Sequence, residues 1–433
     1  MKARFVLATF AVLALSATDA EAAGFALDVQ SARGTGMGAA VTAFINDSSA
    51  IFYNPAGISQ GKGFDAQAGV MLIAPSFKYT SRAGESTSTK FEVVPPVHAY
   101  AAAGLTDELS VGVGVFTPFG LDLAWPDDWV GRRQITSASL RTFDINPTAA
   151  YRFGPVRVGA GFQLVRATVR LQRRIAFGES EGGTDLGAGT WGVGGNVGAQ
   201  VEAIKNRLSF GAHYRSAVKL SFDGLADFQD VPASLQNAIH DQAVSTSLVT
   251  PDSFAIGGAV RPIPNLLLDA EIVWIGWGSF RSIDLTFPDD ETNTLASSRP
   301  KSWKSTVNYH AGAEVNLTDA IRLRGGALFD PSPSPANTLT PDIPDASRLN
   351  LALGGGYQHT SGFFADLGYQ FLILFSREST SPEFPGSYGG FVNILGVSLG
   401  WKSPRSTTDP APAPATTGNA QPQNSKGNQA SVR

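Results

Sequence analysis

The chain has 433 residues, with 47 glycines, 27 phenylalanines, no cysteine and a formal net charge of −4 at pH 7. The absence of cysteine excludes disulfides, thiol catalysis and a lipid-modified cysteine after a signal peptide, and the charge gives no sign of a nucleic-acid partner. Abundant glycine and aromatic residues favour β-strands over helices.

Residues 1–22 are predicted to form a secretory signal peptide. Lys2 and Arg4 supply the positive start, and an apolar run of about 13 residues follows, which is short for a membrane span. The Ala-Glu-Ala sequence at 20–22 then offers a small-x-small cleavage site, so the mature chain would begin at residue 23 or 24. The alternative is an N-terminal anchor helix.

Alternating side chains indicate β-strands in much of the remaining chain. Between Thr306 and Leu317, every second residue is Val, Tyr, Ala or Leu, and the intervening residues are polar or glycine. An extended strand would place these two sets on opposite faces. After the signal, no segment approaches the roughly 20 apolar residues of a transmembrane helix. A membrane protein with this pattern has to be a closed barrel, because only helices and closed barrels satisfy their backbone groups in lipid.

The loops between the predicted strands alternate in length. We expect about fourteen strands, near 64–80, 93–105, 108–118, 138–153, 155–173, 186–203, 206–222, 251–262, 265–280, 301–317, 320–329, 347–359, 362–377 and 388–402. Short turns at one end and long loops at the other are typical of an outer-membrane barrel with its short turns in the periplasm. A soluble β-sandwich would have shorter strands. The prediction is an all-β membrane protein in the Gram-negative outer membrane, with an antiparallel barrel over residues 63–402.

One predicted strand, 155–173, changes its apolar face part of the way along. Val156, Val158 and Ala160 share one face, whereas Val165 and Ala167 lie on the other. A change of face inside a strand predicts a β-bulge. The alternative is that the upper part of this strand stands above the membrane.

Residues 23–62 fit no strand and contain glycine and Asn-Pro breaks. Several motifs here and in the barrel resemble the FadL-type family of transporters for long-chain fatty acids and aromatic hydrocarbons. They are the runs 23–25 (AGF), 30–34 (QSARG), 47–57 (DSSAIFYNPAG), 116–120 (FTPFG), 330–333 (DPSP) and 343–348 (IPDASR). In this order, they extend the resemblance over residues 23–402.

The resemblance implies a barrel of fourteen strands with an N-terminal hatch inside it, here residues 23–62. It implies passive, ligand-gated diffusion: a groove between the outer loops captures a hydrophobic ligand, which passes to a buried pocket near the mature N-terminus. Movement of the N-terminal segment, with a kink in the third strand, would release the ligand sideways into the membrane. The resemblance also implies a monomer among the lipid and lipopolysaccharide of the outer membrane, inserted by the barrel-assembly machinery.

Two groups of residues in the N-terminal segment are candidate functional residues. Phe25, Ala26 and Leu27 would line the buried pocket; the alternative is that they only fasten the plug. Asn54-Pro55-Ala56 aligns with the Asn-Pro-Ala motif of the family's hatch and would act as a gate; the alternative is a structural turn, which Asn-Pro favours in any fold. Glycines on the predicted inner faces would leave room for the plug: Gly112, Gly114, Gly159, Gly161, Gly192, Gly194 and Gly198.

The loop at 223–250 is the candidate capture site. The run 231–234 (VPAS) indicates a helix start, with proline in its first turn. The apolar residues expected to form part of a ligand groove are Leu225, Phe228, Leu235 and Ile239. Exposed apolar residues on an outer loop favour a binding surface, with packing against neighbouring loops as the alternative.

We expect no enzyme activity, no cofactor and no metal site. The five histidines, His98, His213, His240, His310 and His359, show no metal-ligand spacing. The predicted inward charges should pair with one another and with the hatch rather than with a ligand carboxylate; they are Asp144, Asp269, Glu271, Arg322, Arg324 and Asp366. A barrel enzyme would need a Ser-His or Asp-His constellation, and a general porin would lack the plug.

Residues 403–433 are rich in Pro, Ala, Thr, Gln and Asn and contain no aromatic residue. This composition predicts a disordered tail, which would hang in the periplasm. The tail departs from the family pattern, because the segment ending at Trp401 already resembles a closing barrel strand.

Overall fold

The computed structural model describes residues 24–290 and 295–404. The predicted signal peptide and nearly all of the predicted tail therefore lie outside the described residues. Within the described ranges, no helix is long and apolar enough to cross a membrane.

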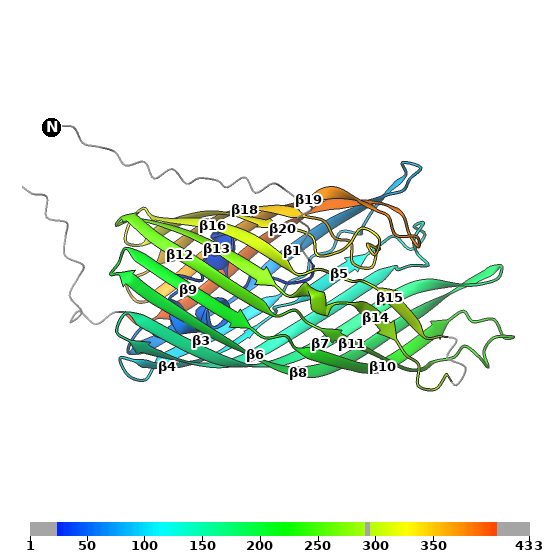
Figure 1. Ribbon diagram of the computed structural model, residues 1–433, viewed down its shortest axis with the longest axis horizontal. Coiled ribbons are helices and arrows are strands. Elements are labelled where there is room, and N and C mark those ends of the chain that lie inside the picture. The colour runs from blue at the N-terminus through cyan, green and yellow to red at the C-terminus, as the bar shows by residue number, and fades with distance from the viewer. Residues whose placement is uncertain (1–23, 291–294, 405–433) are drawn as a thin grey trace, which may run out of the picture. The chain divides into compact units, whose positions relative to one another are not determined.

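Fourteen antiparallel strands form a closed barrel (Figure 1). The wall strands are β1 (Gly63–Thr80), β3 (Val97–Gly104), β4 (Leu109–Phe116), β6 (Ser137–Phe153), β7 (Val156–Phe177), β8 (Ser180–Ile204), β9 (Leu208–Arg215), β12 (Ser253–Ile263), β13 (Leu266–Ile275), β16 (Thr306–Asn316), β17 (Ile321–Asp330), β18 (Arg348–Gln358), β19 (Phe363–Ser379) and β20 (Gly386–Lys402). Pairing of β20 with β1 closes the ring, from Asp65 opposite Lys402 to Thr80 opposite Ser387. The predicted fourteen-stranded antiparallel barrel is confirmed.

Further strands extend the wall sheet at its loop end. They are β2 (Ser86–Ser88), β5 (Gly120–Ala124), β10 (Lys219–Gln229) and β11 (Gln242–Val249), while β14 (Ser282–Leu285) and β15 (Ser297–Pro300) form a separate two-stranded sheet. Two segments expected to be long loops, 174–185 and 223–250, are therefore largely strand. The β7–β8 hairpin turns tightly at Gly178, whose φ of 69° suits glycine. Above the membrane, the outer faces of these strands lack the apolar stripe that identifies the lower strands in the sequence.

The predicted β-bulge in 155–173 is wrong, because β7 keeps one register with β8 from Val156 to Phe177. The change lies in what the two faces contact. Low on the strand, Phe162 is 52% exposed on the outer face, whereas higher up Val165 is buried inside and Arg170 is exposed. An apolar outside therefore gives way to a polar outside and an apolar inside. This pattern fits a strand that projects above the lipid.

Residues 24–62, called here the N-terminal segment, lie inside the barrel, where Figure 1 shows their short blue helices enclosed by the wall. The helices are α1 (Ala32–Gly36), α2 (Ala50–Tyr53) and the 3-10 helix η1 (Pro55–Ile58). Helix α1 packs against β18, β19 and β20, and η1 packs against β6, β7 and β8. The approach is close: a Cβ atom added at Gly368 would stand 2.3 Å from the carbonyl oxygen of Ala32.

Buried ion pairs hold the N-terminal segment to the wall. The Arg33 guanidinium lies 2.8 Å from Asp47 within the segment and 3.3 Å from Glu314 on β16. Arg324 on β17 contacts Glu314 at 2.8 Å and Asp366 at 2.5 Å. Burial alone would raise the pKa of the Asp47 carboxyl, but the charge of Arg33 and a hydrogen bond from Ser49 lower it to about 2.

Most of the predicted inward charges have partners, as expected. Glu271 accepts hydrogen bonds from the backbone N–H groups of Val41 and Thr42, and Asp144 pairs with Arg215 at 3.2 Å. Asp269 differs, because neither of its carboxylate oxygens has a hydrogen-bond partner among the described residues. The expected pairing therefore holds for Arg324, Asp366, Glu271 and Asp144 and fails for Asp269, and Arg322 makes no ion pair among the described residues.

Candidate functional site

The third wall strand is broken between β4 and β5, at residues 117–119. Pro118 lies in the break and has no N–H to donate to a sheet. The N-terminal segment takes up the free backbone groups: the Leu27 N–H donates to the Pro118 oxygen, and the Gly120 N–H donates to the Phe25 oxygen, both at 2.9 Å. Ala26 stands opposite Phe119 in an antiparallel bridge. The start of the N-terminal segment therefore pairs with the broken strand from inside the barrel.

A gap in the wall lies beside this break. The β3–β4 ladder ends where Ala99 stands opposite Val115, and the next backbone hydrogen bond between the two flanking segments runs from Lys90 N to Ala124 O. Between these points lies the segment 91–96, which includes the consecutive prolines Pro95 and Pro96. Prolines interrupt a ladder because they lack the donor group. The wall is therefore unpaired over a short stretch between the segment 91–96 and the broken third strand.

A cavity of about 630 Å³ joins the N-terminal segment to this gap. Its inner side is formed by residues 24–29 and by apolar side chains of β17, β19 and β20. Its outer side includes residues 92–96 and reaches Phe143, which is 43% exposed on the outer face of β6. The lining side chains that face the inside include Leu328, Leu372, Val392 and Ile394. The cavity therefore connects the barrel interior with the outer face through an unpaired part of the wall.

Phe25 fixes the inner end of this cavity to an aromatic cluster. Its ring lies 4.8 Å from Trp277, 5.6 Å from Phe280, 5.8 Å from Trp303 and 6.1 Å from Phe119, measured between ring centroids. Such edge-to-face and tilted contacts add to the free energy gained by burial. Phe25 is 3% exposed. The structure thus places all three predicted pocket residues, Phe25, Ala26 and Leu27, along the cavity, with Phe25 also holding the segment in place.

The second predicted group, Asn54-Pro55-Ala56, lies away from this cavity, at the inner surface of β7, β8 and β9. The Asn54 Nδ2 donates to the Thr42 oxygen at 2.9 Å and to the Ala199 oxygen at 3.0 Å, and its Oδ1 accepts from the Ala56 N–H at 3.2 Å. Asn54 is fully buried. These contacts fasten the turn to the wall.

Tyr53 and Gln30 link the two groups, and the sequence reasoning missed both residues. The Tyr53 hydroxyl accepts from the Gln30 N–H and donates to the Asp28 oxygen, each at 3.0 Å. The Gln30 side chain donates to the Thr117 oxygen at 2.6 Å and accepts from the Thr117 N–H at 3.2 Å. The chain of contacts therefore runs from the Asn54 turn to the broken third strand. Only the fold brings these residues together, although Gln30 and Tyr53 lie in two of the motifs that carry the family resemblance.

The predicted capture loop is a β-hairpin, formed by β10 and β11, and not a helix. Residues 233–238 form turns, and Asp230 begins them with a φ of 56°. Leu225 and Phe228 lie on opposite faces of β10: Leu225 is 69% exposed, whereas Phe228 packs on Phe287 with 6.4 Å between ring centroids. Helical spacing therefore misled the prediction, because the flanking residues 219–226 and 242–249 pair as strands.

A buried ion pair joins two of the outer loops. The Lys301 Nζ lies 2.8 Å from an Asp342 carboxylate oxygen and donates to the Thr340 hydroxyl at 2.7 Å. Burial would raise the pKa of Asp342, but the charge and hydrogen bond of Lys301 lower it to about 2. In the same loop, Asp345 accepts a hydrogen bond from the Gly24 N–H at 3.0 Å. This loop therefore anchors the start of the N-terminal segment.

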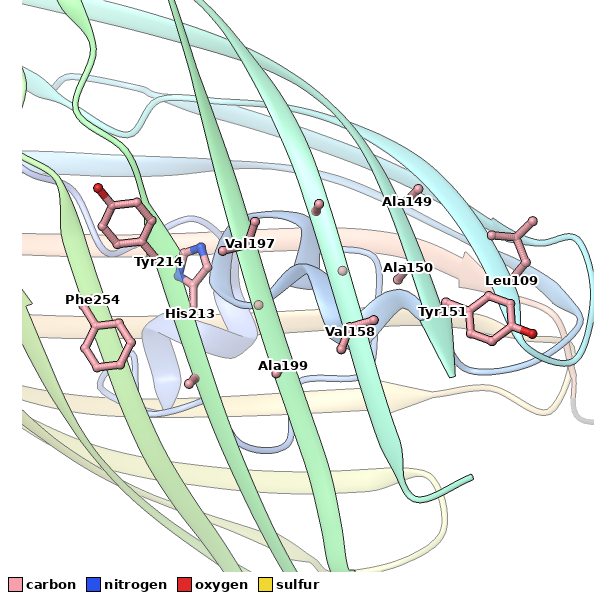
Figure 2. Close-up of a pocket in the computed structure, with 14 residues that line it drawn as sticks. Leu109, Ala149, Ala150, Tyr151, Val158, Val197, Ala199, His213, Tyr214 and Phe254 are labelled. Atoms are coloured by element: carbon pink, nitrogen blue, oxygen red, sulfur yellow. The ribbon is translucent and has the colours of Figure 1, made fainter. Parts of the chain in front are cut away.

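The outer face of the wall carries a shallow apolar groove of about 570 Å³ where the Asn54 turn touches the inner face (Figure 2). Small outward residues on β6 to β9 form its floor: Ala149, Ala160, Ala199 and Ala212. The wall is thin here because the inward neighbours include Gly159 and Gly198. A Cβ atom at Gly159 would lie 2.5 Å from the Pro55 backbone.

We expect Gly159→Leu to displace the Asn54 turn and make the barrel leak ions. The added side chain would overlap the Pro55 backbone, and overpacking of this kind costs about 1–3 kcal/mol. The measurement is conductance in planar lipid bilayers. The matched control is Ala160→Leu, which places the same side chain on the outer face. Equal, low conductance in both variants would show that the turn is not needed to seal the barrel.

Comparisons with known proteins find related sequences and folds. The family described as "Outer membrane protein transport protein (OMPP1/FadL/TodX)" has a model that matches residues 13–385. The chain is 23% identical to the long-chain fatty acid transport protein of Escherichia coli K12, over 86% of this chain and 92% of that protein. It is 24% identical to a putative outer membrane protein of Neisseria meningitidis serogroup B, over 89% and 92% respectively.

Two solved structures share the fold. A Pseudomonas aeruginosa FadL homologue superposes with a TM-score of 0.80 at 18% identity, covering 88% of this chain and 99% of that one. The P. putida toluene transporter TodX superposes with a TM-score of 0.70 at 16% identity, covering 90% and 100%.

Proposed function

The chain belongs to the OMPP1/FadL/TodX family of outer membrane transport proteins, and we propose that it admits long-chain fatty acids or related hydrocarbons by passive diffusion. Its closed barrel spans the outer membrane. Uptake of monoaromatic hydrocarbons is the alternative, because the relatives and structural neighbours include proteins named for fatty acids and for toluene. Members of this family are transport proteins, which argues against an enzyme.

The observation that carries the proposal is the cavity of about 630 Å³ that reaches from residues 24–29 to the unpaired gap in the wall. An alkyl chain gains about 0.8 kcal/mol for each CH₂ group removed from water. A ligand in this cavity keeps that gain if it leaves through the wall into lipid, and loses it if it leaves into the periplasm. The lateral route is therefore the favourable exit for an oily compound.

We propose that the ligand opens its own exit by displacing Phe25, Ala26 and Leu27. These residues line the cavity and hold the broken strand through two backbone hydrogen bonds. A ligand that occupies the apolar space beside Leu27 competes with these contacts. The Asn54-Pro55-Ala56 turn would act as the fixed end of the hatch, and Tyr53 would transmit movement between the two groups.

Capture at the outer loops is also a proposal. Leu225 and Leu235 are exposed on the β10–β11 hairpin, whereas Ile239 and Phe228, which lies on the opposite face of β10 from Leu225, are half-buried. Exposed apolar side chains on an outer loop support a binding surface for a hydrophobic compound. We also propose that the protein is a monomer, that it is surrounded by the lipid and lipopolysaccharide of the outer membrane, and that the barrel-assembly machinery inserts it there.

The test is uptake of a labelled long-chain fatty acid, beside toluene, by an uptake-deficient outer-membrane host complemented with the wild type or Asn54→Ala. We expect the wild type to restore uptake of at least one ligand. Asn54→Ala should lose part of that uptake at equal surface expression, because it removes the hydrogen bonds to Thr42 and Ala199. Entry of small sugars without entry of either hydrophobic ligand would contradict the proposal and indicate a general porin.

A further inference from the structure

A second, smaller cavity of about 80 Å³ lies on another side of the N-terminal segment. It shares Ala26, Leu27 and Asp28 with the larger cavity, so these residues form the partition between the two. The remaining lining comes from the third-strand break, from β9, β12, β13 and β16, and from other parts of the N-terminal segment, including Thr42, Phe52 and Tyr53. The cavity does not reach the gap in the wall.

The second cavity is amphipathic. Its apolar lining includes Leu27, Phe119 and Val273, which adjoin the aromatic cluster around Phe25. Its polar lining includes two deeply buried histidines, His213 and His310 (Figure 2 labels His213, on β9). At about 80 Å³ the cavity has room for only one end of a ligand, and its lining suits an end that carries a single polar group on an apolar chain.

Both histidines have an unused ring nitrogen. His213 is 8% exposed and His310 is 5% exposed, yet neither Nε2 atom has a hydrogen-bond partner among the described residues. The Nδ1 atom of His310 lies 3.2 Å from a carboxylate oxygen of Glu271. This contact holds the ring from the side opposite Nε2. Buried polar groups in native proteins are normally hydrogen-bonded, and an unsatisfied one needs an explanation. A polar group of a bound ligand would supply the missing partner.

Among the described residues, the one cation that lines the cavity, Arg215, is already bound to other groups of the protein, and the remaining charged side chains in the lining, Asp28 and Glu271, are acidic. Arg215 donates to Asp144 and to the Phe52 oxygen, and its guanidinium stacks 4.8 Å from the Phe52 ring. Glu271 accepts two backbone hydrogen bonds from the N-terminal segment. An anionic ligand would therefore enter beside the Asp28 and Glu271 carboxylates, without a free cation offered by Arg215. This arrangement disfavours a carboxylate.

A hydroxyl group fits the remaining requirement. An imidazole nitrogen is a donor or an acceptor according to its tautomer, and a hydroxyl both donates and accepts. It can thus pair with either form of His213 and His310. We propose that the second cavity binds the hydroxyl end of a hydrophobic alcohol, so that the compounds transported include hydroxylated hydrocarbons. The inference rests on the proposed transport function and narrows its substrate class.

The test compares octane, 1-octanol and octanoate binding to the full-length protein in detergent. Binding is followed by the intrinsic tryptophan fluorescence, to which Trp277 and Trp303 contribute from the aromatic cluster beside the cavity. His213→Leu should weaken 1-octanol binding about five- to tenfold, the size expected for one lost hydrogen bond, and leave octane binding unchanged. His213→Gln, which can still donate and accept, should retain alcohol binding and keeps the test decisive if the leucine variant does not fold. Val273→Ala, at the apolar end, should weaken both ligands alike.

Two outcomes would overturn the inference while leaving transport intact. One is equal loss, or no loss, of octane and 1-octanol binding in His213→Leu. The other is octanoate binding more tightly than 1-octanol in the wild type and weakening in His213→Leu. If none of the three compounds binds and none is taken up by cells, the proposed transport function itself fails, and the inference fails with it.

Discussion

An Ala26→Cys, Phe119→Cys double variant is expected to lose uptake when oxidised and to regain it when reduced. Ala26 and Phe119 stand opposite each other, flanked by backbone hydrogen bonds from Leu27 and Gly120. In such a pair, the two Cα atoms are about 4.5 Å apart, which lies within the range that a disulfide spans. The bond would prevent residues 25–27 from leaving the broken third strand.

The absence of native cysteine makes this experiment clean, because only the introduced pair can form a disulfide within the chain. Each single cysteine variant controls for the lost side chain, which matters most for Phe119 because its ring packs on Phe25. Uptake by each single cysteine variant should change with neither oxidant nor reductant. If the oxidised double variant takes up ligand as fast as its reduced form, the N-terminal segment does not need to leave the break, and the proposed gating is wrong.

The barrel is predictable from sequence because its signal is repeated and local. Membrane-spanning strands such as β16 alternate apolar and polar residues along their length, since one face meets lipid and the other meets the interior. The signal weakens above the membrane, where β7 turns a polar face outward. The predictions therefore identified the wall strands but misread 155–173 as bulged and 223–250 as a helical loop.

The site is less predictable because distant parts of the chain form it. The Gln30 side chain pairs with Thr117, and Gly24 pairs with Asp345, across separations that no local pattern encodes. Phe25, Ala26 and Leu27 were identified only through the family resemblance. The gap at 91–96 and the unpaired ring nitrogens of His213 and His310 could be found only after the backbone pairing and the cavities were known.

Arg33→Met is expected to loosen the N-terminal segment and to give the barrel a persistent leak. Arg33 lies between Asp47 and Glu314, and the side chains of all three are nearly buried. Removing one partner of a buried ion pair costs about 3–5 kcal/mol, because a buried charge remains without compensation. In this protein the lost free energy weakens the contact between the N-terminal segment and β16, because Glu314 lies on β16. Ion conductance in planar bilayers and sensitivity of cells to large antibiotics would both rise.

A second substitution distinguishes lost charge balance from lost packing. Arg33→Met combined with Asp47→Asn removes both charges of the pair, while Glu314 keeps Arg324 at 2.8 Å. We therefore expect the double variant to leak less than Arg33→Met alone, a coupling that a double-mutant cycle measures directly. Arg170→Met, which breaks the exposed pair with Asp185, should change conductance little, because surface pairs contribute about 0–1 kcal/mol. A double variant that leaks as much as Arg33→Met would assign the effect to the lost stacking of Arg33 on Phe44, whose ring centroid lies 5.2 Å from the guanidinium. In that case the ion pair would not be what holds the segment in the barrel.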